Sequence, residues 1–301
     1  MNTSADSTAY INKLTTLQPA INAWKIYLFD QEKSPYTIKS FEGDLNLLIK
    51  FLPADKTLGE ITTADLNHFL EWVKNGRGKN IPCSPKSYAR RITTLKSFFH
   101  WLQRYGTITL DPAKNVLQKT AVSPLPDVLS QDEQVLLLAT AQKILERDDS
   151  DARPFTLLKL LLDTGIKKSE CLNIKLQHIE MENPENPFLV VRYPLPKDRN
   201  KERKIVLNPH WLGVYRKYLS QYQAQEIVFP WSPRRLEYIL EDLGKAAELS
   251  KHVSFSMCRW SCALNDFRAG MDYDHLRQKL GISKIQWREV KTKLTTLDQA
   301  T

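Results

Sequence analysis

The feature that most constrains the fold is an apolar helix that stops and restarts between residues 160 and 174. The first helix has one apolar face, formed by Leu157, Leu158, Leu161 and Leu162. Gly165 then provides a residue that can adopt the positive φ with which helices often end. Apolar residues at helical spacing resume after Lys167 or Lys168, at Cys171, Leu172 and Ile174. The sequence therefore predicts a sharp corner between two buried helices.

The chain of 301 residues is long enough for two domains that each bury a core. No apolar run has the length of a membrane span, and the polar N-terminus does not resemble a signal peptide. The cysteines show neither a Cys-x-x-Cys pair nor a histidine partner at zinc spacing; they are Cys83, Cys171, Cys258 and Cys262. We therefore expect a reduced, cytoplasmic protein without a metal or another cofactor.

The positive charge of the chain is clustered. The net charge is +9, and the basic residues gather at 74–79, 86–96, 197–204 and 284–293. Clusters on separate elements that share a face are typical of a nucleic-acid groove. The alternative is that these side chains are simply solvated.

The first part of the chain predicts a bundle of four helices. Apolar stripes at helical spacing place them at 17–32, 36–52, 63–75 and 85–105. Ser-Pro pairs open the second and fourth helices, at Ser34 and Ser84. The fourth helix also has a basic polar face, formed by Lys86, Arg90, Arg91 and Lys96. This face either contacts nucleic acid or is the solvated side of a core helix.

The rest of the chain predicts a second helical domain with a small antiparallel sheet. Residues 107–127 contain several prolines and little periodicity, and are expected to be a linker between domains at 15–106 and 128–295. Two strands, at 188–192 and 204–207, flank a charged hairpin loop. Helices are expected at 131–146, 154–163, 208–219, 233–247, 256–269, 273–280 and 284–294. Residues 1–14 and 296–301 are expected to be flexible.

The first box, Thr-Gly-Ile-Lys-Lys-Ser-Glu from Thr164 to Glu170, resembles the first active-site box of the tyrosine recombinases, the phage integrase family. The pattern Ser-x-x-Thr-x-x-x-Phe-x-x-x-Leu that begins at Ser34, and the pair Phe98-Phe99 before Leu102, resemble the SAM-like core-binding domain of the same family. Residues 256–260 stand in the place of its second box, and the segment from Ala269 to Asp272, followed by a helix ending in Leu-Gly, resembles the family's Ala-Gly-x-Asp that follows that box. The resemblance implies a two-domain, Xer-like integrase with an N-terminal SAM-like domain and a C-terminal catalytic-type domain.

The resemblance also implies which residues occupy the family's catalytic positions. Lys197 on the hairpin loop is the match to the catalytic lysine, and Arg259 is the match to the second arginine. Three family positions are substituted, with Lys167 for the first arginine, Ser256 for the His or Lys of the second box, and Ile282 for the later histidine. Lys168 and Lys201 remain alternative matches to the first arginine and the lysine.

The family's nucleophile is missing from the aligned position. It is a tyrosine about nine residues after the later histidine, where this chain has Lys291, and no tyrosine follows Tyr273. The leading hypothesis is a protein that binds double-stranded DNA but is impaired in strand cleavage, alone, with a second copy or with an active recombinase. The expected DNA contacts are Lys86, Arg90, Arg91, Lys96, Lys167, Lys197, Lys201, Arg203 and Arg259. The alternatives are an active recombinase with an unaligned or in-trans nucleophile, and a helical interaction protein.

Overall fold

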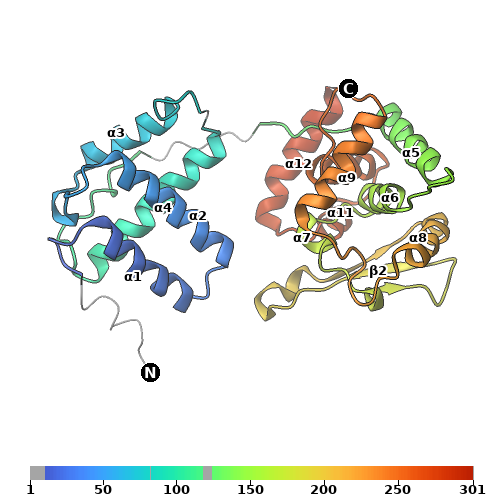
Figure 1. Ribbon diagram of the computed structural model, residues 1–301, viewed down its shortest axis with the longest axis horizontal. Helices are drawn as coiled ribbons and strands as arrows, with labels where there is room; N and C mark the ends of the chain where they lie inside the picture. The colour runs from blue at the N-terminus through green and yellow to red at the C-terminus, as the bar shows by residue number, and fades with distance from the viewer. Residues whose placement is uncertain (1–10, 82, 118–123, 301) are drawn as a thin grey trace. The chain divides into compact units, whose positions relative to one another are not determined.

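The chain forms two compact units, Met1–Pro124 and Leu125–Thr301. The computed structural model describes residues 11–81, 83–117 and 124–300 (Figure 1). The described residues are mainly helical, with a three-stranded antiparallel sheet in the second unit. This confirms the predicted fold class. None of the helices in these ranges is both long and apolar enough to cross a membrane.

The N-terminal unit is the predicted bundle of four long helices. They are α1 (Leu17–Asp30), α2 (Pro35–Phe51), α3 (Thr63–Lys74) and α4 (Pro85–Arg104). The two Ser-Pro pairs open α2 and α4 as expected, because the Ser34 and Ser84 side chains accept hydrogen bonds from backbone N–H groups of the first turn. Aromatic residues fill the centre, where Trp24 packs edge-on against Phe98 with ring centroids 5.3 Å apart.

The N-terminal unit extends beyond α4 into the segment expected to be a linker. Ile108, Ala113 and Val116 are buried in its core, and the Thr63 hydroxyl donates to the carbonyl oxygen of Pro112 at 2.8 Å. Residues 107–117 therefore belong to this unit, because their apolar side chains fill its core despite the lack of helical periodicity. Residues 118–123 of the expected linker lie outside the described residues.

The expected flexible termini also differ in part from the structure. Ile11 is buried against the N-terminal core, whereas residues 1–10 lie outside the described residues. At the other end, α12 continues to Gln299 and buries Leu297, so residues 296–299 are helical. Residue 301 lies outside the described residues.

The C-terminal unit is built around α6 (Arg153–Thr164). The side chains of Leu157, Leu158, Leu160 and Leu161 are fully buried. Helices α5 (Gln131–Leu145), α8 (Pro209–Tyr222), α9 (Pro233–Ala246) and α10 (Phe255–Arg268) pack around it. The unit also contains α7 (Lys168–Cys171), α11 (Tyr273–Lys279) and α12 (Lys284–Gln299). Every helix predicted in this half is present.

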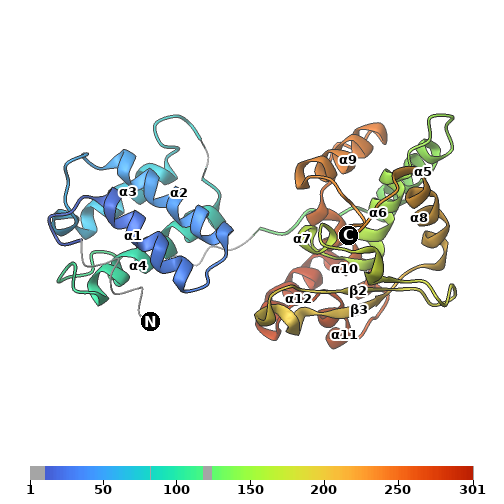
Figure 2. The same ribbon diagram turned by 60° about the horizontal axis from the view of Figure 1, so that its bottom comes forward.

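The sheet consists of β1 (Ile179–Glu180), β2 (Phe188–Val191) and β3 (Arg203–Val206), in that order. Leu189 pairs with Ile205, and both point into the core. The loop between β2 and β3 contains a short 3₁₀ turn, Pro196–Lys201. Figure 2 shows that β3 lies beside α11. The prediction missed β1, since a strand of two residues carries no alternation signal.

The predicted corner after α6 is present at Gly165, which has a φ of 59°. A Cβ atom there would lie 3.2 Å from Cys262 Sγ and 3.3 Å from a methyl group of Leu280, so the corner needs both the conformation and the small size of glycine. Helix α7 then lasts only to Cys171. Ile174 has left the helix, and its carbonyl oxygen accepts from Val228 N at 2.8 Å. Tertiary pairing thus overrides the helical spacing seen in the sequence.

Candidate nucleic-acid interface

Three cationic side chains from separate elements meet around the carboxylate of Glu170 on α7. They are Lys167 before α7, Arg203 on β3 and Arg259 on α10. Arg203 binds both carboxylate oxygens, with N–O distances of 3.0 and 2.9 Å. Lys167 Nζ lies 3.9 Å from Glu170 Oε1. We call Glu170 and these three cations the cation cluster.

The carboxylate of Glu170 is buried, with 2% of its side chain exposed. Tyr193 OH and the backbone N–H of Lys167 also donate hydrogen bonds to it. Burial raises the pKa of Glu170, but the hydrogen bonds and charge of Arg203, together with Tyr193, outweigh this effect and lower the pKa to about 2. Glu170 is therefore an anion at neutral pH and holds the cluster together.

Arg203 points into the protein, and 7% of its side chain is exposed. Besides the two bonds to Glu170, its Nε donates to the Lys279 carbonyl oxygen at 2.6 Å and its Nη1 to that of Lys201 at 3.1 Å. A guanidinium has five N–H groups. Arg203, which was expected to contact DNA, thus forms its hydrogen bonds within the C-terminal unit.

Arg259 and Lys167 reach the same end of α11 as Arg203. Arg259 donates from Nη1 to the carbonyl oxygen of Gly165 and from Nη2 to that of Leu280 at 2.6 Å. Lys167 Nζ donates to the carbonyl oxygen of Gly281 at 3.2 Å. Burial lowers the pKa of both side chains; the charge of Glu170 opposes this effect, and nearby cations add to it. The structure therefore brings these two candidate residues together at the end of α11.

The hairpin loop brings further lysines toward the cation cluster. Lys197 is exposed on the 3₁₀ turn, and Lys201 forms an ion pair with Asp198. The pKa of Asp198 is lowered mainly by the hydrogen bond from Lys201, and the charges of Lys197 and Lys167 lower it further. Both candidate hairpin lysines thus lie within the electrostatic field of Lys167.

The other substituted positions have ordinary structural surroundings. Ser256 is exposed in the first turn of α10, whereas Ile282 is half-buried against a small core that includes Leu280. The ammonium of Lys291 lies 4.2 Å from the centre of the Tyr273 ring, a distance that allows a cation–π interaction. The position that we predict for the nucleophile therefore holds an exposed lysine on α12 that lies over the Tyr273 ring.

In the N-terminal unit, two of the four expected DNA contacts on α4 are tied to a buried acid. Arg90 binds both oxygens of Asp44, at 2.9 and 2.7 Å, and Arg91 Nε lies 3.4 Å from Asp44 Oδ1. Asp44 is 2% exposed, and Thr94 donates to it as well. In the described part of the chain Lys86 and Lys96 form no ion pair, so they are the more available cations of this face.

The sequence reasoning missed the second half of this face. Thr93, Ser97, His100 and Arg104 are exposed and continue the stripe of Lys86 by steps of three or four residues. Lys96, His100 and Arg104, together with Lys114, line a cavity of about 500 Å³. Helix α4 contains no Asp or Glu, a signal that the sequence alone provides. The basic stripe from Lys86 to Arg104 spans ~27 Å at the helical rise.

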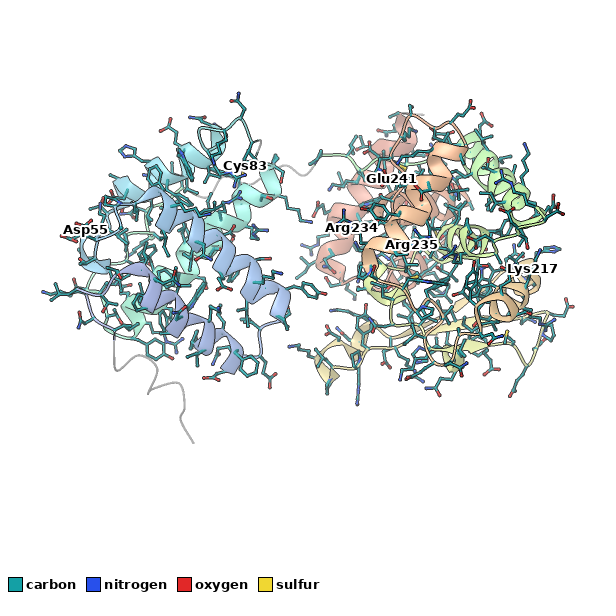
Figure 3. The ribbon with its side chains drawn as sticks, viewed as in Figure 1. Asp55, Cys83, Lys217, Arg234, Arg235 and Glu241 are labelled. Atoms are coloured by element: carbon teal, nitrogen blue, oxygen red, sulfur yellow. The ribbon has the colours of Figure 1, made fainter. Side chains whose placement is uncertain are left out.

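A second missed pair of cations lies on α9 in the C-terminal unit. Arg234 and Arg235 are exposed in its first turns (Figure 3). Arg234 Nε donates to Tyr238 OH at 2.6 Å. The signal present in the sequence was the pair of adjacent arginines directly after the Ser-Pro start of this helix. Across the described ranges, no group of three His, Cys, Asp or Glu side chains could hold a metal ion.

Comparisons with known proteins show the family of the chain. Residues 21–106 match the family model "Phage integrase, N-terminal SAM-like domain", and residues 127–289 match "Phage integrase family". The chain is 24% identical over 282 residues to the tyrosine recombinase XerD of Listeria innocua, covering 88% of this chain and 90% of that protein. It is 25% identical over 304 residues to the tyrosine recombinase XerC of Oceanobacillus iheyensis, covering 94% and 93%.

Solved structures share the fold. A XerH site-specific recombinase bound to a palindromic difH substrate has a TM-score of 0.73 at 17% identity, covering 99% of this chain and 92% of that chain. A lambda integrase dimer bound to a COC' core site has a TM-score of 0.70 at 17% identity, covering 92% and 77%. From these matches and its two domains, the chain belongs to the phage integrase family of tyrosine recombinases.

Proposed function

We propose that this chain binds double-stranded DNA in the cytoplasm, at sites of DNA integration or recombination, and does not cleave it. The observation that carries the proposal is Lys291, which stands at the position of the family's nucleophile. Its ammonium packs on the ring of Tyr273. A lysine side chain cannot form the family's tyrosine linkage to DNA.

The other substitutions weaken cleavage further. Lysine at 167 offers a point charge in place of the planar fork with which arginine holds two phosphate oxygens. Ser256 is a poor base at neutral pH, and Ile282 has no hydrogen-bond donor. Three of the groups that would move protons or stabilise the reacting phosphate are thus missing together, beside the retained Lys197 and Arg259.

Two features support DNA binding. The cation cluster and the hairpin lysines Lys197 and Lys201 together offer several phosphate ligands, and the basic stripe of α4 offers more. The structural relatives include a recombinase and an integrase bound to their DNA sites. We propose that duplex DNA binds to these elements here, with a second copy or an active recombinase as a partner on the site.

The proposal predicts binding without a covalent adduct. Duplexes that the protein selects from genomic fragments in a gel shift are rebuilt with a nick beside the bound site, which traps any covalent intermediate. We expect a shifted band on a native gel and no adduct on a denaturing gel, because no nucleophile is in place. An active Xer recombinase on its own nicked site provides the positive control.

Two other outcomes would contradict the proposal. A stable adduct would establish an active recombinase with a different or in-trans nucleophile, which peptide mapping of the adduct would identify. No shift at either low or moderate salt would favour a helical interaction protein, since binding through phosphates strengthens as salt is lowered.

A further inference from the structure

We propose that Arg203 is a positioning residue: it fixes the end of α11 so that Lys167 and Arg259 are held together for a DNA phosphate. The DNA part of this inference rests on the proposed function, whereas the positioning of α11 can be tested without DNA. In the sequence Arg203 looks like one more basic residue of the hairpin. Its contacts assign it a different role.

The first step is the arrangement at the end of α11, where three successive carbonyl oxygens each accept a hydrogen bond from a different cation. Lys279 O accepts from Arg203 at 2.6 Å, Leu280 O from Arg259 at 2.6 Å, and Gly281 O from Lys167 at 3.2 Å. The last carbonyl groups of a helix have no partner within the helix and attract cations. The path of the chain through residues 279–281 therefore sets the places of all three side chains.

The second step is that Arg203 ties this path to the rest of the unit. It grips both oxygens of Glu170 on α7 and also bonds the Lys279 carbonyl, so it links β3, α7 and α11. Its side chain is 7% exposed, whereas that of Lys167 is 35% exposed. Arg203 thus holds β3, α7 and α11 together, and Lys167 is the side chain that a phosphate can reach.

The third step is the close fit at Gly281, which has a φ of 57°. A Cβ atom on this residue would lie 2.5 Å from Arg203 Nη1 and 2.8 Å from its Cζ. The backbone therefore lies directly against the guanidinium, and only glycine permits this contact. Because the carbonyl of Gly281 also accepts from Lys167, a displaced Arg203 would move the anchor of Lys167.

The electrostatics leave Lys167 and Arg259 ready for an anion. Arg203 uses both oxygens of Glu170, while Lys167 remains 3.9 Å from that carboxylate. The contacts of Arg259 described above are to backbone carbonyls, which carry no formal charge. A phosphate bound here would supply the charge that these two cations need, without the desolvation of a further carboxylate.

The first test measures hydrogen exchange in the full chain without DNA. In Arg203→Met we expect the amides of residues 280–283 to exchange at least about tenfold faster, because the end of α11 loses its tie. Arg192→Met is the matched control, since Arg192 lies on the same hairpin and binds Glu202 at 3.0 Å but has 59% of its side chain exposed. Equal protection of residues 280–283 in Arg203→Met and in the parent would overturn the inference.

The second test is a double-mutant cycle on duplex binding, read from gel shifts at several salt concentrations. Lys167→Met should weaken binding of the parent by roughly tenfold and reduce the salt slope by about one. Arg203→Met should reduce the slope by about two, because it misplaces Lys167 and Arg259 together. In the Arg203→Met background, Lys167→Met should then change affinity by less than about twofold, since coupled residues are not additive.

Additive losses with a slope change of one for each variant would mean that Arg203 is itself a phosphate ligand, and would overturn the inference. Unchanged binding by Arg203→Met would do the same. If circular dichroism shows that Arg203→Met does not fold, the two tests are repeated on Gly281→Ala. This variant keeps every charge and should reproduce both the faster exchange and the binding defect. If the parent does not bind DNA, the proposed function fails, while the exchange experiment still decides the positioning.

Discussion

Replacing Glu170 by glutamine should lower the free energy of unfolding of the C-terminal unit by roughly 3 kcal/mol at pH 7. The pKa of Glu170 falls from its ordinary 4.5 to about 2, a difference of about 2.5 units. Because the pKa is depressed in the folded state, the ionised carboxylate contributes its full stabilisation above about pH 4.5. That contribution is lost as the pH falls toward 2. Glutamine also leaves the buried Arg203 without its counter-charge.

This prediction is best measured by hydrogen exchange at graded denaturant, followed on peptides from α7 and β3 so that the two units are read separately. In the parent, these peptides should lose protection between about pH 4.5 and 2, and this loss should be much smaller in Glu170→Gln. Glu202→Gln is the control, because Glu202 lies on the same hairpin but pairs with the exposed Arg192. An equal effect of both substitutions would contradict the assignment of Glu170 as the centre of the cluster.

Replacing Lys86, Lys96 and Arg104 together by glutamine should weaken duplex binding by roughly 10²–10³-fold at 0.1 M salt. Each lost phosphate contact changes log K by about 0.9 per decade of salt, so three contacts should reduce the salt slope by about 2.7. These cations lie along the basic stripe of α4, and Lys96 and Arg104 line its cavity. The loss should be similar for different DNA sequences, since phosphate contacts carry little sequence information.

The control is an equal change of charge elsewhere on the N-terminal unit. Lys33, Lys39 and Lys50 are exposed lysines outside α4, and their triple replacement by glutamine should leave the salt slope within about one of the parent. The same loss of slope in both triple variants would mean that the overall charge, and not the stripe, attracts DNA. Titration of one labelled duplex at four salt concentrations is sufficient to compare them.

The sequence predicted the helices well because their signals are local. The Ser-Pro starts of α2 and α4, and the stop at Gly165, depend on residues within one turn of each other. The burial of Ile108 and Val116 in the predicted linker could not be expected from the sequence, because it depends on contacts with distant helices and the two residues show no helical spacing. The two-residue strand β1 is held by its partner β2, and no pattern of its own marks it.

The candidate site was predicted only in part for the same reason. The resemblance predicted Lys167 and Arg259 as site residues, and both side chains bind carbonyl oxygens at the end of α11. It could not predict that Arg203 pairs with Glu170, 33 residues away, or that Arg90 pairs with Asp44, 46 residues away. A basic residue reads the same in the sequence whether it faces solvent or a buried acid.

The attachment of Arg90 and Arg91 to Asp44 has a consequence for how the N-terminal unit meets a duplex. The two arginines fix the rotation of α4 about its own axis, so the direction in which Lys86, His100 and Arg104 project is set before any DNA arrives. Little ordering entropy then remains to be lost on contact. The cationic side chains of α4 would then be oriented for the duplex already in the free protein. The spacing of phosphates that they prefer would be set in the absence of DNA.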